Sequence, residues 1–348
     1  MEKEARKEIQ ERIIPLEGEE EVHDDELSAI IKLVSPGTAL RTALDGALKT
    51  GRGALIVVEN DNVLPIIDGG FEIHCRFTPQ KLIELCKMDG AIILSKDMKK
   101  INYANVTLAP SSKIETAETG TRHKAAERTA KQTFSLVIAI SERKNEITLF
   151  YKDIKYPIKS TDELLRKSNE HIQILEKQKE TFDINKKRLN HLELQNHSSI
   201  DQAINAIQRG KIIEKISQEL EKTMIELGKE GSLLKARLKE LTRGVKKETN
   251  LIIKDYTRLD VQKSKILLDT LAYDEIIDSE NILRALAQEN SSNHQIKGWR
   301  ILSKTSLSDS EINKLVKETG NLQRAVLRML EDEQAKSFEE DLNKIKLD

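Results

Sequence analysis

A short basic run at the start of a predicted helix is the strongest chemical signal in this sequence of 348 residues. It comprises Gly120, Thr121, Arg122, His123 and Lys124, and good helix formers follow it. Its basic groups oppose the positive end of the helix dipole, where acidic side chains are normally favoured. A bound anion would compensate, because free backbone N–H groups and basic side chains both bind phosphate. We therefore expect a phosphate-containing ligand at this helix start.

Asp89 is a carboxylate that could work with such a phosphate site. It opens the run Asp89-Gly90-Ala91, between a predicted helix and a predicted strand. A simple Asp-Gly turn is the ordinary explanation. The position also suits metal-assisted phosphoryl transfer, in which the aspartate holds a divalent ion that acidifies a hydroxyl. Basic groups would then neutralise the charge that develops on phosphorus.

Ordinary structural roles compete with these chemical ones. A single histidine is usually a hydrogen-bonded structural group, but the flanking cations favour a phosphate contact for His123. Arg128 and Lys131 follow one or two turns later and are expected to face solvent. Ser141 ends an apolar strand, where its hydroxyl could reach a phosphate, although serine is common at such positions. No Walker-type loop, nucleophile elbow or His-Glu-x-x-His site is present in the sequence.

Short strand-like runs mixed with helices surround these residues and predict an α/β domain. A turn at residues 68–70, Asp-Gly-Gly, is explained by hairpin geometry between two of the runs. The first 25 or so residues are charged, lack a clear pattern and are expected to form a partly ordered arm. The predicted strands are 54–58, 63–67, 71–76, 91–94, 102–108, 134–140 and 146–151, and the predicted helices are 26–34, 38–50, 78–88 and 121–132.

The sequence changes character from Thr161 to about Leu286. Strand-like runs disappear, and apolar residues recur at helical spacing, as in Leu175, Phe182 and Leu189. Packing of long helices on one another is the simpler interpretation. Coiled-coil oligomerisation is the alternative, although lysines 179 and 186 interrupt the seam.

A small third unit follows a linker-like stretch at residues 291–293. Its first part, residues 297–330, holds seven basic and three acidic side chains. Residues 331–348 reverse this balance, with seven acidic and three basic side chains.

The overall composition excludes several classes of protein. The balance of 57 basic against 58 acidic residues argues against a uniformly basic nucleic-acid binder. The two cysteines, Cys75 and Cys86, are too few for a structural zinc site, and Cys86 falls on an apolar face typical of a buried thiol. No apolar run approaches the length of a membrane span, and the charged N-terminus is unlike a signal peptide. We expect a cytoplasmic protein that does not contact membranes.

The two motifs together resemble those of diadenylate cyclase domains, which read Asp-Gly-Ala and Gly-Thr-Arg-His-Arg. The runs 116–132 and 134–151, with 35–38 and 53–57, are similar to the DisA family. That family joins a cyclase domain to a helical spine and a C-terminal helix-hairpin-helix domain. The resemblance implies a multi-domain α+β fold with three parts. These are an α/β cyclase domain with a mixed sheet flanked by helices at 1–155, an all-α spine at 156–290 and a small helical domain at 291–348.

The resemblance also implies a reaction, the condensation of two ATP molecules into cyclic di-AMP and two pyrophosphates. Two cyclase domains would face each other, so that the 3′-hydroxyl of one ATP attacks the α-phosphorus of the other. The family assembles as an octamer, and Mg²⁺ or Mn²⁺ is expected. By analogy Asp89, Arg122 and His123 are catalytic, and Asp89 is the metal ligand. The implied nucleotide-binding residues are Gly90, Ala91, Leu108 (through its backbone), Gly120, Thr121, Arg122, His123, Lys124, Ala125 and Ser141.

Two departures from the family pattern limit this reading. Lys124 stands where the family usually has arginine, so it keeps the charge but lacks the planar bidentate fork, and we expect weaker phosphate positioning. Residues 331–348 contain no glycine, whereas the family's hairpin uses glycines to grip DNA phosphates. DNA binding is therefore doubtful. A nucleotide-binding sensor or scaffold with weak or no turnover is the alternative function, and a purely helical DNA-associated structural protein is a third.

Overall fold

The computed structural model describes residues 26–197, 200–288, 295–331 and 335–347. These residues form two compact units. The first comprises the described residues up to Arg166 together with Thr223–Ser232, and the second comprises the described residues of 167–222 and those from Leu233 onward. The predicted N-terminal arm and the predicted linker at 291–293 lie outside the described residues. The first unit contains α3 (Ala39–Lys49), β1 (Ala54–Val58), η1 (Leu64–Ile66), β2 (Ile67–Asp68), β3 (Phe71–Arg76), α4 (Pro79–Leu85), β4 (Ala91–Leu94), β5 (Lys100–Leu108), α5 (Thr121–Thr133), β6 (Val137–Ser141), β7 (Glu146–Tyr151) and β8 (Ile154–Ile158).

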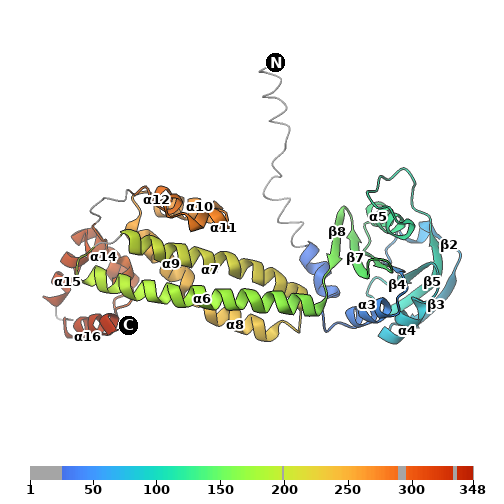
Figure 1. Ribbon diagram of the computed structural model, residues 1–348, viewed down its shortest axis with the longest axis horizontal. Helices are drawn as coiled ribbons and strands as arrows, with labels where there is room; N and C mark the ends of the chain where they lie inside the picture. Colours follow the sequence, from blue (N-terminus) through green and yellow to red (C-terminus); the bar gives the residue numbers. More distant parts are fainter. Residues whose placement is uncertain (1–25, 198–199, 289–294, 332–334, 348) are drawn as a thin grey trace, which may run out of the picture. The chain divides into compact units, whose positions relative to one another are not determined.

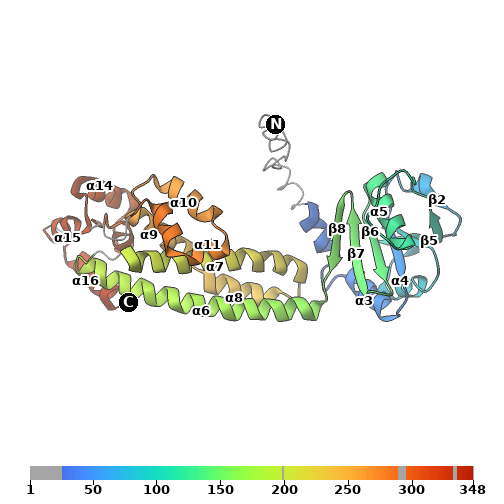
Figure 2. The ribbon, with the colours of Figure 1, turned by 45° about the horizontal axis from the view of Figure 1, so that its top comes forward.

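A mixed sheet forms the centre of the first unit. Its strand order is β2-β5-β4-β1-β6-β7-β8, and β3 also pairs with β5. Strands β1 and β4 are parallel and the other pairs are antiparallel. The expected mixed sheet flanked by helices is therefore confirmed. Figure 2 shows β6, β7 and β8 side by side.

Helices cover both faces of the sheet, with α5 on one face and α3 and α4 on the other (Figure 1). The α5 face has a core of small and branched residues, including Ala126, Ala130 and Val137. The other face buries α3, α4 and the helical segment 26–33 in a second core. Helices α3 and α4 begin where the sequence places a cap, because the hydroxyls of Thr38 and Thr78 accept hydrogen bonds from backbone N–H groups in their first turns.

Four local predictions in this unit are wrong. Residues 63–67 form a 3-10 turn and only the start of a strand, since Pro65 lacks the N–H that a strand would need. Residues 68–70 do not close a hairpin, because β2 and β3 both pair with β5. The strand predicted from Phe134 begins at Val137, and Phe134 ends α5 in a left-handed conformation. The helix predicted to reach residue 88 ends at Leu85.

Strand β8 is absent from the sequence-based prediction. It lies at the edge of the sheet, which explains how it tolerates Pro157. It also continues the sheet to Ile158, three residues past the expected domain end at 155.

The second unit is entirely helical in its described residues. Helices α6 and α7 run side by side (Figures 1 and 2), and Leu175, Phe182 and Leu189 of α6 are buried as predicted. The interrupting lysines 179 and 186 form ion pairs with Asp183. The helices are α6 (Thr161–Leu194), α7 (Ile200–Leu227), α8 (Ser232–Thr242), α9 (Val245–Tyr256), α10 (Val261–Thr270), α11 (Tyr273–Ile277), α12 (Ser279–Leu286), α13 (Trp299–Leu302), α14 (Asp309–Thr319), α15 (Leu322–Leu330) and α16 (Ala335–Leu347).

The C-terminal helices share one hydrophobic core with the spine helices. That core runs from Leu189 and Ile207 to Leu302, Ile312 and Phe338. A buried ionic cluster joins the same elements. Arg300 of α13 is fully buried, and its guanidinium donates to Glu193 Oε2 (2.6 Å) and Glu248 Oε1 (3.0 Å).

Candidate active site

The sheet topology brings the predicted site residues together at one end of its central strands. Parallel strands β1 and β4 both start there, with Leu55 opposite Ala91. The antiparallel neighbours β5 and β6 end at the same edge, since Ala91 pairs with Val106 and Ala54 with Ile140. The lead-in to β4 carries Asp89 and Gly90, while Leu108 and Ser141 are the last residues of β5 and β6. Residues far apart in the sequence thus meet along one rim.

The start of α5 lies at this rim because Arg122 reaches the lead-in to β1. A Cβ built on Gly53 would lie 1.9 Å from Nη1 and 2.8 Å from Cζ of Arg122. The guanidinium therefore occupies the space that any side chain at residue 53 would need. Gly53 was not among the predicted site residues.

The first turn of α5 is open to an anion. Gly120 is the N-cap residue, no side chain caps the helix, and its first turn contains no acidic residue. The first backbone bond of the helix is from Lys124 N to Gly120 O at 2.9 Å. The preceding N–H groups point out of the helix start, as the phosphate hypothesis requires.

Gly90 is a position where only glycine fits. Its φ is +83°, and a Cβ would lie 2.8 Å from the carbonyl carbon of Asn105 and 2.9 Å from Val106 O. Asp89, directly before it, is exposed at the rim. The Arg52 guanidinium donates to Lys87 O (2.8 Å) and so ties the β1 lead-in to the β4 lead-in.

His123 is half-buried, and its ring meets Phe150 edge-on with centroids 6.2 Å apart. Burial lowers the pKa of His123 below its usual value. The Glu118 carboxylate opposes this shift, and nearby cations reinforce it. These are Lys144, Lys155 and Arg122. The imidazole is therefore neutral near pH 7, so it can donate one hydrogen bond to a phosphate without adding charge.

Glu118 is an acidic group at the helix start that the sequence analysis missed. It lies two residues before the N-cap, is 11% exposed and forms an ion pair with Lys155 of β8. A carboxylate at this end of a helix is favourable to the dipole. The cationic first turn thus has a partial internal compensation in the absence of ligand. The position of Glu118, two residues before the capping Gly120, could have been recognised in the sequence. Its pairing with Lys155 could not, because strand β8 was not predicted.

Arg128 and Lys131 hold a loop instead of only facing solvent. Arg128 Nε donates to Ile114 O (2.9 Å), and Lys131 Nζ donates to Glu115 O (3.3 Å). The Gln132 side chain accepts from Ser111 N (2.7 Å). The outer face of α5 therefore anchors residues 109–120, the segment that leads into the basic turn.

The remaining predicted residues form the wall and floor of the rim. Ser141 is 9% exposed, and its hydroxyl accepts a hydrogen bond from Lys144 N (3.3 Å). Ala91, Leu108 and Ala125 all belong to or pack against the apolar cluster beneath α5. An apolar wall of this kind suits the flat face of a nucleobase.

The described residues contain no group of three or more His, Cys, Asp or Glu side chains that could hold a metal ion. Asp89 is thus not part of such a group in the described part of the chain. That is compatible with Mg²⁺ in a phosphate-transfer site, since this ion is commonly held by one or two carboxylates together with substrate phosphates and water.

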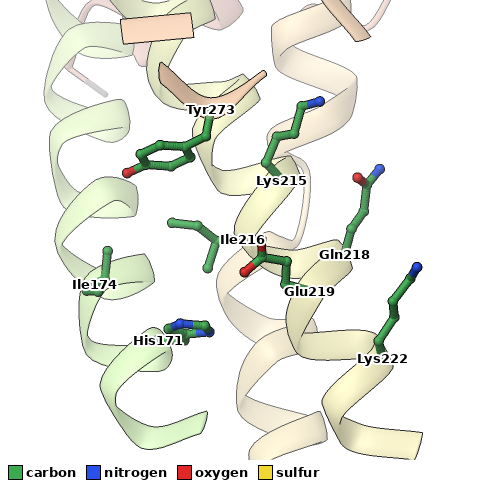
Figure 3. A pocket seen from close by; sticks show the side chains of 8 residues that line it. All are labelled: His171, Ile174, Lys215, Ile216, Gln218, Glu219, Lys222 and Tyr273. Atoms are coloured by element: carbon green, nitrogen blue, oxygen red, sulfur yellow. The ribbon is translucent and has the colours of Figure 1, made fainter. Parts of the chain in front are cut away.

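The helical unit has a separate pocket of about 540 Å³. Figure 3 shows Tyr273 and Ile216 facing the space between α6 and α7, with His171 reaching in from α6. Lys215, at its edge, donates to Asp269 O (3.1 Å). No predicted site residue lines it. Among the described helices, none has the length and apolar character needed to cross a membrane.

The fold and the site define a nucleotide-binding α/β domain followed by a helical region. The family model "DisA bacterial checkpoint controller nucleotide-binding" matches residues 41–154, and the model "DisA bacterial checkpoint controller linker region" matches residues 158–295. The chain is also similar to curated proteins named DNA integrity scanning protein DisA. The one from Acetivibrio thermocellus is 40% identical over 319 residues, which cover 89% of each chain. The Bacillus subtilis protein is 40% identical over 291 residues, which cover 81% of each chain.

The chain belongs to the DisA family. Its N-terminal domain is a diadenylate cyclase domain, which makes cyclic di-AMP from ATP. The family resemblance and the enzyme class expected from the two motifs are thereby confirmed.

Proposed function

We propose that the rim of the sheet in the first unit is the ATP site and one half of the cyclase centre. The observation that carries this proposal is the convergence of the uncapped cationic turn of α5 with the Asp89-Gly90 lead-in at one edge of the sheet. Gly53 contributes by leaving room for Arg122.

The phosphate-binding residues follow from the helix start. Thr121, Arg122, His123 and Lys124 hold the triphosphate through side chains and the free N–H groups beginning at Gly120. Arg122 supplies a planar fork, whereas the imidazole of His123 supplies a ring N–H donor.

The nucleoside occupies the adjoining wall. Gly90 and Ala91 line it, Leu108 contacts the adenine through its backbone, and Ala125 closes the apolar side. Ser141 adds a hydroxyl on the phosphate side of the same rim.

Asp89 has two roles in this scheme. It orients the attacking 3′-hydroxyl and would hold a divalent ion, Mg²⁺ or Mn²⁺. When bound, that ion lowers the pKa of the hydroxyl and shields the charge of the phosphates. The cations of the α5 turn stabilise the charge that develops on the attacked phosphorus.

A single copy binds one ATP and contributes one Asp89. Because cyclic di-AMP is built from two ATP molecules, two copies must face each other to close its ring. We propose a homo-oligomer built on such pairs, with the family's octamer as its expected form. We also propose that the chain has three domains, at residues 1–155, 156–290 and 291–348.

The decisive experiment is to incubate the purified protein with ATP and Mg²⁺ or Mn²⁺ and to separate the products by chromatography. Asp89→Asn should abolish cyclic di-AMP formation while leaving the fold intact. Asp68→Asn is the matched control, because Asp68 is also an exposed aspartate before a glycine. Full activity of Asp89→Asn would refute the role of Asp89. ATP binding by the wild-type protein without any product would favour the sensor alternative.

DNA binding by the C-terminal helices is not part of this proposal. The connection from α15 to α16 contains no glycine, and the chain from residue 331 onward is acidic. Three of the seven basic residues at 297–330 are also paired internally: Arg300 is buried, Lys304 pairs with Glu248 at 2.9 Å, and Arg328 pairs with Glu318 at 2.5 Å. Branched DNA should therefore change the cyclase rate little through this region, and nanomolar binding mapped to residues 297–348 would contradict the proposal.

A further inference from the structure

The hairpin of α8 and α9 carries a concentration of positive charge that the cyclase reaction does not use. Residues 232–247 contain six basic side chains and one acidic side chain, in a chain whose net charge is −1. Arg237 pairs with Glu176 and Glu240. The other five are exposed and form no ion pair within the described parts of the chain. We call them the α8–α9 basic stripe: Lys235, Lys239, Arg243, Lys246 and Lys247.

The spacing of the stripe places its charges in a row. Lys235 and Lys239 are four residues apart, so they share one face of α8 with a rise of about 6 Å between them, and Arg243 follows at the same spacing in the turn after Thr242. Arg237 lies on a different face, where it meets α6. The row is therefore free for an external partner.

The turn between the helices extends the row. Gly244 has a φ of +77° and open space around it, and as the N-cap residue it lets α9 begin at Val245, two residues after Arg243. No side chain caps α9, and its first turn carries Lys246 and Lys247 beside one acid, Glu248, which pairs with Arg300 and Lys304. These two cations oppose the helix dipole. A bound polyanion would relieve this, as at the start of α5.

We propose that the α8–α9 basic stripe binds the phosphate backbone of nucleic acid. Regularly spaced cations suit a regularly spaced polyanion, and contacts of this kind position a protein without reading sequence. An anionic membrane fits less well, because Leu238, Leu241 and Val245 are buried in the unit and Leu233 is the one large apolar side chain exposed along the described hairpin. The stripe thus provides a nucleic-acid surface on the spine, independent of the C-terminal helices.

The test is fluorescence anisotropy of a labelled DNA duplex with the full-length protein, at KCl concentrations between about 50 and 200 mM. The variant carries Arg243→Gln, Lys246→Gln and Lys247→Gln together. The matched control carries Lys314→Gln, Lys317→Gln and Arg324→Gln, which also removes three exposed cations from a helical hairpin.

The stripe variant should lose about tenfold or more in affinity, and its slope of log affinity against log salt should fall by about three. The control should match the wild-type protein. Both variants should keep cyclic di-AMP formation and the circular dichroism of the wild type, which separates loss of binding from loss of folding or of the cyclase site.

Three results would overturn the assignment. The stripe variant could bind DNA as tightly as the wild type. The control could lose binding instead. The wild-type protein could bind vesicles of anionic phospholipid but no DNA duplex, which would assign the stripe to a membrane surface.

Discussion

The guanidinium of Arg122 fills the space above Gly53, with Nη1 only 1.9 Å from where a Cβ at residue 53 would lie. The two residues are distant in the sequence and come from different elements, the lead-in to β1 and the first turn of α5. A glycine in one element thus determines where the phosphate-binding fork of another can rest.

Gly53→Ala should consequently displace Arg122 and raise the KM for ATP by about tenfold, the value of one charge-assisted contact. The KM values of Gly53→Ala, Arg122→Ala and the double variant, from steady-state kinetics, complete a double-mutant cycle with the wild type. If the glycine acts through Arg122, adding Gly53→Ala to Arg122→Ala should change little. Fully additive losses would mean that Gly53 acts on something else.

Lys124→Arg should lower the KM for ATP by about two- to tenfold. Arginine restores the planar fork that the family motif carries, and it keeps the positive charge of the first turn. The matched control is Lys131→Arg in the same helix, because Lys131 is committed to Glu127 at 2.8 Å and to the loop. An unchanged KM for Lys124→Arg, measured beside this control, would show that Lys124 contacts the phosphates as a simple point charge.

Arg300→Met should destabilise the helical unit by about 3–5 kcal/mol, because it leaves Glu193 buried without its counter-charge and leaves Glu248 with Lys304 alone. Urea unfolding can be followed by the fluorescence of Trp299, the one tryptophan in the sequence. Arg284→Met is the control, since its ion pair is exposed and should contribute little. Combining Arg300→Met with Glu193→Gln should recover part of the loss, and a failure to recover any would argue against charge as the cause.

The buried Asp255 should make the helical unit less stable as pH rises. Burial, reinforced by Glu193, raises the pKa of this carboxyl to about 7, against about 3.9 in an unfolded chain. A raised folded-state pKa gives stability that is complete below the unfolded value and is lost as pH rises through the folded one. The contribution should therefore fall between about pH 4 and pH 7.

Asp255→Asn should flatten that dependence in unfolding curves recorded by Trp299 fluorescence at several pH values. The Asp255 carboxylate accepts hydrogen bonds from the backbone N–H groups of Trp299 (2.8 Å) and Arg300 (2.9 Å). The amide of asparagine has one oxygen and can keep one of these two bonds. Asp274→Asn, an exposed aspartate, should leave the wild-type slope unchanged. An equal slope in Asp255→Asn would assign the pH dependence to other groups.

The sequence was sufficient to predict the elements that carry the site, because their signals are local. Short apolar runs marked β1, β4 and β7, and threonine caps marked the starts of α3 and α4. The motifs at Asp89 and Arg122 were recognisable without knowing the sheet topology. That topology was needed to show that both lie on one rim.

What sequence reasoning missed depends on contacts between distant segments. No role could be predicted for Lys155, because its partner Glu118 lies far away in the sequence, before α5. Its strand β8 was also not predicted, since Pro157 is unusual in a strand. Arg300 was counted as surface charge, since nothing local reveals that carboxylates of α6 and α9 converge on it. Exposure and partnership are properties of the packed chain.

The buried cluster around Arg300 also sets an order of events during synthesis of the chain. Glu193 and Arg300 are 107 residues apart, so the ribosome needs about 5–20 s to produce the second after the first. Until then the carboxylate must stay hydrated, and the end of α6 cannot close into its final core. The spine is thus completed by the residues made after it, and a nascent chain that stops before α13 carries an unfinished spine.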